Sequence, residues 1–427
     1  MLLRTTLVIS AVVITTLAFR SLEAAGTAGT SPNAVASMGP VIQLGEWTFP
    51  EAAVMDGVGQ VHLISGKLVE KGGVHLDFAH ITVDREGKVV EEPIVAGAPY
   101  VKGGVAAAFD AAGVLRVSVD GKHYRRLPSG WTGPESGPRC QAMIQVAGIL
   151  VCAIQARGKE HREWGLLGVV PLPVTLPATK LLVLREAGSR WLPWKIVDPD
   201  DQYDIGLFQL AADQSRGLHL LYIPMASDLN RYVERNPRYA HLTVEDSTAS
   251  AEHAASAEAS SAEVSSVWPD HDAAVVGTDI KVETRRVSLA VDPESGHALG
   301  ASSDWGKGFS GNFPLIFTVR DGVAGVARPI DGFAGSRRAE AHLAPAGQDR
   351  FLVLLGLTTG AFVQKAHLSY YLLSGDQWSG PIDLGEASSS QGATSGFQVV
   401  ADKGDVFVTW TDYADNKLRG RWLHVAN

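Results

Sequence analysis

One short pattern recurs along the chain and constrains its fold more than any other feature. A run of alternating β-forming residues ends near Asp or Gly, a turn follows, and a second run such as Val61-His62-Leu63 returns. Residues 396–427 show three short β segments, separated by the Lys403-Gly404 turn and by a polar loop. Bulky β-formers at alternate positions between turn residues are typical of antiparallel strands. The pattern therefore predicts an all-β protein built from repeated hairpins.

Seven such hairpins can be placed, and their spacing predicts a seven-bladed β-propeller. Several of the intervals lie near the roughly 40–50 residues expected for one blade. The second and third hairpins lie close together and could share strands, so six blades are the alternative. The hairpins occupy residues 52–64, 105–119, 142–154, 207–222, 287–301 and 341–356 and the C-terminal stretch from 396.

The two ends of the propeller are expected to meet in one sheet. Residues 39–46 read Gly-Pro-Val-Ile-Gln-Leu-Gly-Glu and resemble residues 380–386, Gly-Pro-Ile-Asp-Leu-Gly-Glu, which close the unit before the last. The last unit has only three strands of its own. We therefore expect Val41–Leu44 to supply its fourth, outermost strand, because closure removes the exposed edges that a linear array would leave.

The N-terminus has the features of a secretory signal peptide over residues 1–25. Arg4 precedes an apolar run, Leu7–Phe19, and small residues follow at Ala24-Ala25-Gly26. Arg20 and Glu23 interrupt this pattern, so an uncleaved anchor is the alternative. We expect a secreted or periplasmic protein with no membrane span after signal removal. A linker is expected over 26–38, the propeller over 39–427, and within it a low-complexity insertion at 244–267, rich in Ser, Ala and Glu.

Cys140 and Cys152 are the only cysteines in the chain. They flank a hairpin that turns at Ala147-Gly148, so the two side chains are expected to be near neighbours. An exported chain meets an oxidising compartment, which permits a disulfide. Two buried thiols are the alternative, and two cysteines alone supply too few ligands for a metal site.

Charge and motifs exclude several classes of function. The formal net charge is −9, which argues against nucleic acid as a partner because phosphate binding needs a basic surface. No phosphate-binding glycine motif, nucleophile elbow or His-Glu-x-x-His helix is present, so we expect no cofactor. His62, His75 and His219 recur as Val-His-Leu or Leu-His-Leu. We interpret them as packing between blades rather than as metal ligands.

Residues 118–124, Ser-Val-Asp-Gly-Lys-His-Tyr, resemble a degenerate Asp-box of the sialidase-like (BNR-repeat) propellers. In that family the Asp side chain organises a tight turn through backbone amides. The wider repeat pattern is similar to this superfamily over nearly the whole chain, as architecture only, and an ordinary Asp-Gly hairpin is the alternative for this segment. The early Arg-Ile-Pro of catalytic sialidases has no counterpart, because Tyr222-Ile223-Pro224 comes late and lacks the Arg. The resemblance therefore implies no catalytic residue.

Topology predicts where a ligand would bind. In a four-stranded blade, the loop from the second to the third strand opens at the same rim of the ring as the loop from the fourth strand to the next blade. Propellers usually bind ligands at this rim. Arginines are frequent in these loops and match carboxylates and sulfates with paired hydrogen bonds, so we expect an anionic ligand such as an acidic sugar. Exposed ion pairs with neighbouring Asp and Glu are the alternative. The candidate ligand-binding residues are Arg139, Tyr203, Asp204, Arg231, Arg285, Asp304, Trp305, Arg337, Arg338 and Glu340.

Two segments of this rim suggest particular roles. Trp305 lies in a Gly-rich loop and could stack on a sugar face or cap the edge of a blade. Residues 158–164 concentrate charge around His161, and we interpret them as an exposed surface loop. Residues from different blades meet only in space, so the sequence assigns no catalytic set.

We expect a monomeric protein that recognises an extracellular carbohydrate, or a protein ligand, at this rim. A glycoside hydrolase or polysaccharide lyase acting on anionic glycans is one alternative, and a non-catalytic scaffold of the cell envelope is another. An enzyme requires a carboxylate, His or Tyr with a shifted pKa and a partner within hydrogen-bond reach. A binding protein requires an exposed aromatic side chain with arginine beside it, and a scaffold requires a large apolar patch.

Overall fold

The structure is a computed structural model in which the described residues all belong to one compact unit, Ala34–Asn427. Every regular element among these residues is a β-strand, and the strands form seven sheets. The expected signal peptide lies outside the described residues, as does the expected insertion apart from Val267. The described residues are 37–46, 49–69, 75–99, 104–167, 170–198, 204–215, 217–225, 237–243, 267–269, 274–275, 284–304, 314–330, 339–359, 364–389, 397–412 and 415–425.

Each sheet is one blade, and within a blade successive strands pair antiparallel in chain order. A short strand, β17 (Val267–Pro269), joins the outer edge of blade three in parallel with that blade's last strand. Blade one comprises β2 (Phe49–Met55), β3 (Val61–Val69), β4 (His75–Val83) and β5 (Val89–Pro99). Blade two comprises β6 (Val105–Phe109), β7 (Leu115–Val119), β8 (Lys122–Leu127) and β9 (Gly130–Ser136). Blade three comprises β10 (Ala142–Val146), β11 (Ile149–Leu167), β12 (Val170–Ala187) and β13 (Arg190–Asp198).

The remaining four blades complete the set. In blade five the outer strand is split into two short pieces that both pair with the third strand. Blade four comprises β14 (Asp204–Ala212), β15 (Gly217–Met225), β16 (Arg238–Thr243) and β18 (Ala274–Val275). Blade five comprises β19 (Thr284–Val291), β20 (Ala298–Asp304), β21 (Leu315–Arg320), β22 (Val323–Ala324) and β23 (Arg328–Pro329). Blade six comprises β24 (Ala339–Gly347), β25 (Arg350–Thr359), β26 (Gln364–Ser374) and β27 (Gln377–Ser389). Blade seven comprises β28 (Gln398–Asp402), β29 (Asp405–Asp412), β30 (Lys417–His424) and β1 (Ser37–Gly45).

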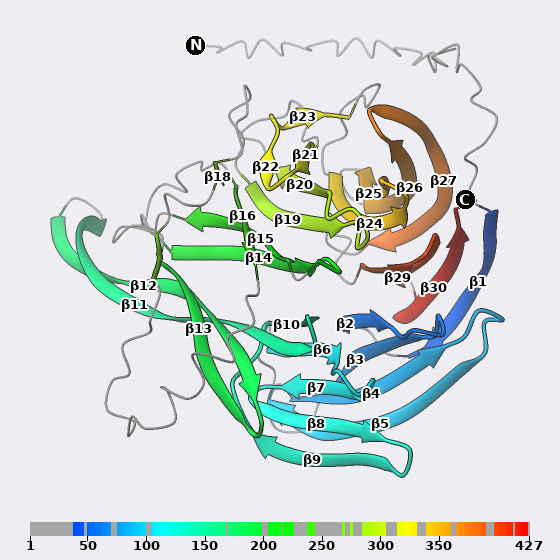
Figure 1. Cartoon of the computed structure of the whole chain (residues 1–427), viewed down its shortest axis with the longest axis horizontal. Helices are drawn as coiled ribbons and strands as arrows, with labels where there is room; N and C mark the ends of the chain where they lie inside the picture. The colour runs from blue at the N-terminus through cyan, green and yellow to red at the C-terminus, as the bar shows by residue number, and fades with distance from the viewer. Residues whose placement is uncertain are drawn as a thin grey trace, which may run out of the picture. The chain divides into compact units, whose positions relative to one another are not determined.

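The seven blades form a closed ring (Figure 1). The first strand of each blade contacts the first strand of the next, from β2 through β6, β10, β14, β19 and β24 to β28, and β28 contacts β2. This arrangement is a seven-bladed β-propeller, so the predicted fold is confirmed and the six-bladed alternative is wrong.

The ring is closed by the N-terminal strand, as the sequence predicts. Strand β1 pairs antiparallel with β30, with Ile42 opposite Gly420, and the two lie side by side in Figure 1. Arg421 Nε donates a hydrogen bond to the Gly39 carbonyl at 2.7 Å. Trp422 Nε1 donates to the Asp84 carbonyl of blade one at 2.9 Å. Blade seven is therefore bonded both to the N-terminal strand and to the first blade.

The core of the protein lies between the blades. Each pair of successive blades shares one cluster of buried apolar side chains, giving seven clusters among the described residues. At the closing seam, Leu44, Phe407 and Trp422 pack against Val61 and Leu63 of blade one. Burial of apolar surface contributes roughly 25 cal/mol per Å2, so these interfaces hold adjacent blades together.

A repeated aspartate explains the Asp and turn pattern of the sequence. Asp56 and Asp110 directly follow the first strands of blades one and two. One carboxylate oxygen of each accepts hydrogen bonds from the backbone amides two and four residues further on. The other oxygen reaches a basic side chain six residues further on, His62 at 3.3 Å or Arg116 at 3.4 Å. The aspartate therefore fixes each hairpin turn from within.

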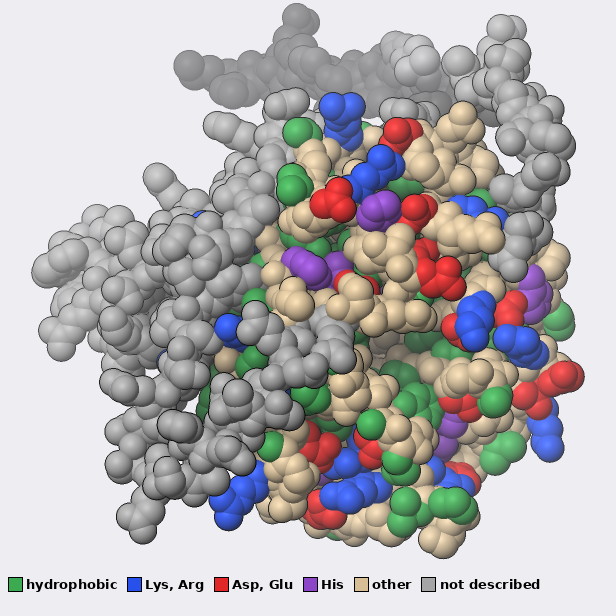
Figure 2. Space-filling model, in the orientation of Figure 1, with side chains coloured by type: hydrophobic (Ala, Val, Ile, Leu, Met, Phe, Trp, Pro, Cys, Tyr) green, Lys and Arg blue, Asp and Glu red, His purple; other side chains and the backbone are tan. Residues whose placement is uncertain are grey.

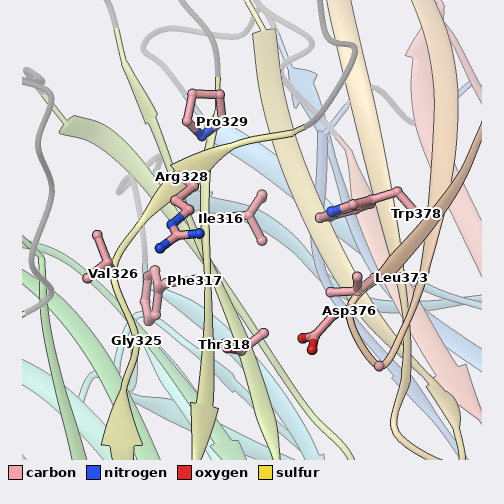
Figure 3. A pocket seen from close by; sticks show the side chains of 11 residues that line it. Ile316, Phe317, Thr318, Gly325, Val326, Arg328, Pro329, Leu373, Asp376 and Trp378 are labelled. Atoms are coloured by element: carbon pink, nitrogen blue, oxygen red, sulfur yellow. The ribbon is translucent and has the colours of Figure 1, made fainter.

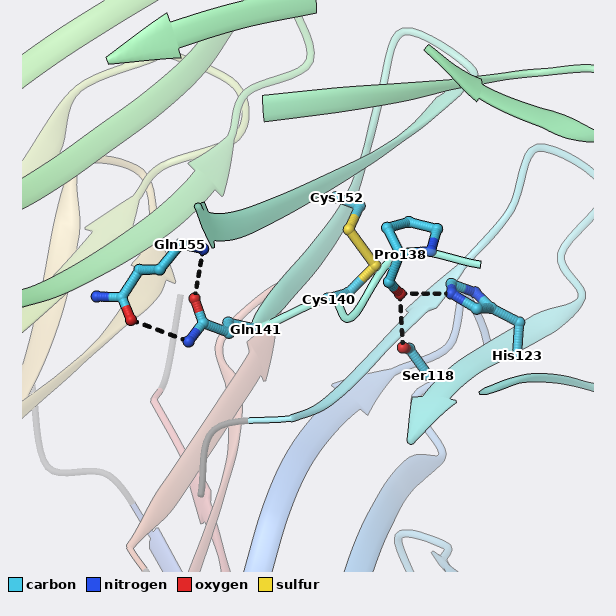
Figure 4. The surroundings of a disulfide bond; sticks show 7 residues. All are labelled: Ser118, His123, Pro138, Cys140, Gln141, Cys152 and Gln155. Carbon is cyan, nitrogen blue, oxygen red and sulfur yellow. Dashed lines mark hydrogen bonds between the residues drawn. A yellow bond between two sulfur atoms is a disulfide. The ribbon is translucent and has the colours of Figure 1, made fainter. Parts of the chain in front are cut away.

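The two cysteines form a disulfide, not the alternative pair of thiols (Figure 4). Cys140 directly precedes blade three and Cys152 lies in β11, so the bond ties the entry of the blade to its second strand. Beside it, the side-chain amides of Gln141 and Gln155 are hydrogen-bonded at 3.1 Å. His123 Nε2 of blade two donates to a backbone carbonyl of the connecting segment at 2.8 Å. Covalent and polar contacts together hold the start of blade three.

One local interpretation of the sequence is wrong. Residues 158–164 belong to β11, which pairs with β12 as far as Leu167 opposite Val170, so they are part of a long hairpin and not a surface loop. The charged side chains of residues 158–164 suggested a loop. Their conformation is determined instead by backbone pairing with β12, which is rich in β-forming residues. Asp120 and Gly121 form the turn between β7 and β8, with φ of 49° and 79°, values typical of an Asp-Gly hairpin.

A pair of histidines lies between blades one and two. His80 is buried, its Nε2 lies 2.9 Å from His62 Nδ1, and the two rings are stacked. The edge of Trp131 in blade two packs against His80, and Phe109 packs against His62. Burial lowers the pKa of His80 to about 4, and His62 lowers it further in spite of Glu92 nearby. His62 therefore packs between two blades, as the sequence predicts.

We expect the protein to lose stability in mild acid because of His80. The folded pKa of His80 lies below the ordinary value of 6.5, so the unfolded chain binds the proton first. Stability from this group is complete above about pH 6.5 and is lost as the pH falls towards 4, with a loss of about 2 kcal/mol at pH 5. Urea unfolding of the wild type and of His80→Gln at pH 7, 6 and 5 tests this. Equal pH dependence in the two proteins would contradict the assignment.

Candidate functional site

The structure describes only part of the predicted ligand-binding rim. Asp204, Arg285, Asp304 and Glu340 lie in β14, β19, β20 and β24, but only their backbone is described. Their role as ligand-binding residues remains a prediction. The predicted residues that lie outside the described part of the chain are Tyr203, Arg231, Trp305, Arg337 and Arg338.

Arg139 is the rim candidate whose side chain the structure describes. It lies in the connection from blade two to blade three, and its Nε lies 3.0 Å from Asp120 Oδ1 in the turn between β7 and β8. A four-to-one connection and a two-to-three turn therefore meet, as the topological argument expects. Both side chains are partly exposed, so the arginine forms the kind of surface ion pair that contributes little to stability.

A cavity lies elsewhere, between the outer strands of blades five and six. Its volume is about 560 Å3, within the range of roughly 300–1,000 Å3 that small-molecule sites occupy. It combines apolar, aromatic and charged side chains. The lining residues are Ile316, Phe317, Thr318, Gly325, Val326, Arg328, Pro329, Leu373, Gly375, Asp376 and Trp378. We call it the blade 5/6 pocket.

The blade 5/6 pocket exists because the outer edge of blade five is interrupted. Between β22 and β23, the Gly325 amide donates a hydrogen bond to the Thr318 carbonyl at 2.8 Å. The edge resumes with Arg328 opposite Ile316 and Pro329 opposite Leu315. Proline is tolerated there because an edge strand does not need every backbone donor. A continuous fourth strand would cover the space that the pocket occupies.

Two polar or aromatic side chains line the pocket from adjacent blades, Arg328 from blade five and Trp378 from blade six. In Figure 3 the Arg328 guanidinium lies beside Phe317, and the Trp378 indole is directed towards Ile316. Trp378 is half-buried, and its ring stands edge-on to Tyr371, 6.3 Å away at 86°. This contact holds the indole in place and leaves it lining the cavity. Arg328 is exposed and forms no ion pair with any residue of the described part of the chain.

A carboxylate lies at the edge of the same pocket. Asp376 occupies the turn between β26 and β27, next to Gly375 with its φ of 59°. Its carboxylate lies 3.6 Å from Arg320 and is 90% exposed. Such a pair is weak because water screens it, so a ligand could replace either partner. The pocket thus offers an aromatic face, a guanidinium with no ion-pair partner among the described residues, and an exchangeable carboxylate.

The chemistry of the pocket suits a ring-shaped polar ligand. An indole supplies a rigid apolar surface, and a guanidinium binds a carboxylate or sulfate through two parallel hydrogen bonds. The floor formed by Ile316, Phe317 and Leu373 is buried and apolar. A ligand with one apolar face and polar or anionic edges would contact all three kinds of group.

Sequence reasoning did not identify Arg328, Asp376 or Trp378. The sequence-based candidates were chosen from the loops at the rim, whereas the pocket lies at the outer strands of two blades. A signal is present in the irregular run from Val323 to Pro329, where a glycine and a proline interrupt an expected edge strand. The Asp-Gln-Trp sequence directly after the Gly375 turn is a second signal, because it places a tryptophan at the start of an outer strand.

Comparison with known proteins identifies the fold. No protein-family model and no curated protein sequence matches the chain. A protein of unknown function from Dyadobacter fermentans matches with a TM-score of 0.50 at 12% identity, covering 92% of this chain and 99% of that one. The polysaccharide lyase Uly1 matches with a TM-score of 0.54 at 9% identity, covering 91% of this chain and 100% of that one. This chain shares its fold with a polysaccharide lyase.

A second lyase has the same architecture. An ulvan lyase from a new family of polysaccharide lyases matches with a TM-score of 0.52 at 11% identity, covering 91% of this chain and 94% of that one. At such identities the likeness shows the fold alone, because one fold carries many activities. Sialidase-like repeats are not shown by these matches. Within the described residues, no helix is long and apolar enough to cross a membrane.

Proposed function

We propose that this protein is a secreted β-propeller that binds an acidic glycan, and that the blade 5/6 pocket is one of its binding sites. The observation that carries the proposal is the pairing of a half-buried Trp378 with Arg328 in one cavity. Arg328 has no ion-pair partner among the described residues, so its charge is available to a ligand. The expected signal peptide supports an extracellular location.

The dimensions of the pocket favour a sugar over a protein ligand. A stable protein interface is a broad surface of roughly 800 Å2 on each partner. This site is instead a concave cavity, and its volume of about 560 Å3 is typical of small-molecule sites. Its arginine favours an anionic ligand despite the overall charge of −9, because a short-range guanidinium contact outweighs the screened repulsion of distant carboxylates. Uronates and sulfated sugars have the required groups.

The predicted rim remains part of the proposal. Arg285 and Glu340 lie in the inner strands of blades five and six, the two blades that also form the pocket. A glycan chain held at the outer pocket could therefore continue along the same two blades. Arg139 pairs with Asp120 and belongs to a different part of the rim.

Polysaccharide cleavage is the second candidate, because two structural neighbours are polysaccharide lyases. A lyase needs a base that can reach the proton next to a uronate carboxylate. His219 and Tyr239 lie within 2.6 Å of each other, but they are only 2% and 1% exposed. Neither can reach a polymer, so this pair does not support catalysis.

Binding to a panel of neutral, uronate-containing and sulfated polysaccharides tests the proposal. We expect the wild type to bind acidic members. Arg328→Ala should weaken binding about 10–100-fold, since hydrogen bonds to charged groups contribute about 1.5–3 kcal/mol. Trp378→Ala should weaken binding because the aromatic face is lost. Affinity electrophoresis, followed by calorimetry with oligosaccharides, measures this. Arg125→Ala is the control, because Arg125 is a partly exposed arginine of blade two paired with Glu135.

Two results would reject the proposal. One is that no acidic polysaccharide binds to the wild type. The other is that both pocket variants bind as tightly as the Arg125→Ala control. Ultraviolet absorbance of the same mixtures reports unsaturated uronates, and its increase with time would establish the lyase alternative instead.

A further inference from the structure

Three side chains of blade four converge on one point. Asp213 directly follows β14, His219 lies in β15, and His241 lies directly opposite His219 in β16. Asp213 Oδ2 lies 3.0 Å from His219 Nε2 and 3.7 Å from His241 Nε2. All three atoms lie within 4.8 Å of one another. Asp213 and His219 are buried, whereas Figure 2 shows other histidine and acidic side chains at several separate places on the face in view.

Comparison with other blades separates this cluster from the repeated hairpin turn. Asp56 with His62, and Asp110 with Arg116, have the same six-residue spacing as Asp213 with His219. In blades one and two a single basic side chain contacts the carboxylate in this way. In blade four His241 adds a second imidazole that faces the same carboxylate oxygen. The turns of blades one and two form without a second imidazole on the carboxylate.

Surrounding hydrogen bonds orient the three groups. Asp213 Oδ1 accepts from the Gly217 amide at 2.7 Å and from the Ser215 hydroxyl at 2.8 Å, which leaves Oδ2 facing the imidazoles. His219 Nδ1 lies 2.6 Å from the buried Tyr239 hydroxyl. Hydrogen bonds of this kind fix the ring orientation and tautomer of histidines that bind metals.

Space between the groups depends on a glycine. A Cβ atom on Gly217 would lie 2.2 Å from Asp213 Oδ2 and 2.3 Å from His241 Nε2. Any side chain at this position would push the carboxylate and the imidazole aside. Gly217 therefore permits the convergence of Asp213 and His241.

We propose that Asp213, His219 and His241 bind one divalent transition-metal ion, with Zn2+ the preferred ion. The ligand atoms are Asp213 Oδ2, His219 Nε2 and His241 Nε2. Zinc sites with three protein ligands use imidazole and carboxylate at about 2.0–2.2 Å and keep one position for water. His241 is 31% exposed, which gives an ion access from solvent. Calcium and magnesium prefer oxygen ligands, so two imidazoles select against them.

The sequence alone leads to a different interpretation of His219, as packing between blades. That interpretation rests on its repeated strand position, and the cross-strand partner His241 is not visible in the repeat. The metal site is independent of the glycan proposal, because it lies in blade four and includes no residue of the blade 5/6 pocket.

Calorimetry with Zn2+ on chelator-treated full-length protein tests this site. We expect one Zn2+ per chain in the wild type, and a loss of affinity of about 100-fold or more in His241→Ala, since perturbing even the outer-shell partners of a metal site typically costs 10–100-fold. His367→Ala is the matched control, because His367 is 39% exposed and its Nε2 lies 3.4 Å from Asp383 in another blade. Circular dichroism of the metal-free proteins verifies that both variants are folded.

A second measurement uses a different readout. Co2+ in place of Zn2+ should give the visible absorption of a low-symmetry site with nitrogen ligands in the wild type and in His367→Ala, and lose it in His241→Ala. Absence of stoichiometric Zn2+ binding would overturn the proposal. Equal Zn2+ affinity in wild type and His241→Ala would also overturn it, and the cluster would then be a hydrogen-bond network only.

Discussion

Replacing Trp422 with alanine should lower the free energy of unfolding by about 3–5 kcal/mol, the cost of truncating a large buried aromatic side chain. Trp422 is 2% exposed and packs against Phe407, with ring centroids 4.8 Å apart. Its Nε1 also donates to the Asp84 carbonyl in blade one. The substitution therefore leaves a cavity at the seam where the ring closes and removes a bond across it. Denaturant unfolding followed by circular dichroism measures the change.

A matched variant separates packing from hydrogen bonding at this seam. Trp422→Phe retains most of the buried aromatic area but leaves the Asp84 carbonyl without the indole donor. We expect a smaller loss of about 1–2 kcal/mol. A loss below about 1 kcal/mol for Trp422→Ala would mean that the seam carries little of the stability that buried aromatic side chains normally provide.

Arg116→Met should destabilise the protein by about 3–4 kcal/mol, because removing one partner of a buried ion pair leaves the other charge uncompensated. Arg116 is 7% exposed, and its guanidinium lies 2.7 Å from Glu186 in blade three and 3.4 Å from Asp110 in blade two. Methionine keeps much of the apolar stem, so the loss reports the charge. Two partly buried carboxylates then face each other without a cation.

Arg125→Met is the control for this ion pair. Arg125 lies in the same blade and pairs with Glu135 at 2.9 Å, but its side chain is 37% exposed. Exposed pairs contribute about 0.2–1 kcal/mol, so the variant should unfold nearly as the wild type does. If the two methionine variants had equal stabilities, the bridge between blades two and three would have no special role.

The hairpins could be predicted because each one pairs residues close together in sequence, and the closure of the ring could be predicted because a terminal segment repeats one inside the chain. Alternating β-formers around a turn specify two paired strands, as at Val105–Phe109 and Leu115–Val119. The closing strand could be identified because residues 39–46 resemble residues 380–386, which lie in the outermost strand of blade six. Local pattern and repetition are therefore sufficient for the architecture.

Contacts between blades could not be predicted in the same way. Arg116 and Glu186 are 70 residues apart, and no pattern links them. Arg328 and Trp378 line one pocket beside the broken edge of blade five, and that break is a detail of strand pairing. The His219–His241 pairing depends on the register of two strands, which a repeat pattern does not reveal.

The most direct measurement is a crystal structure of the protein soaked with an acidic oligosaccharide that it binds in solution. The proposed function predicts density for a sugar ring against the Trp378 indole, with its carboxylate or sulfate within hydrogen-bond distance of Arg328. Density only at the mouth of the channel, with the blade 5/6 pocket free of sugar, would contradict the assignment of this pocket.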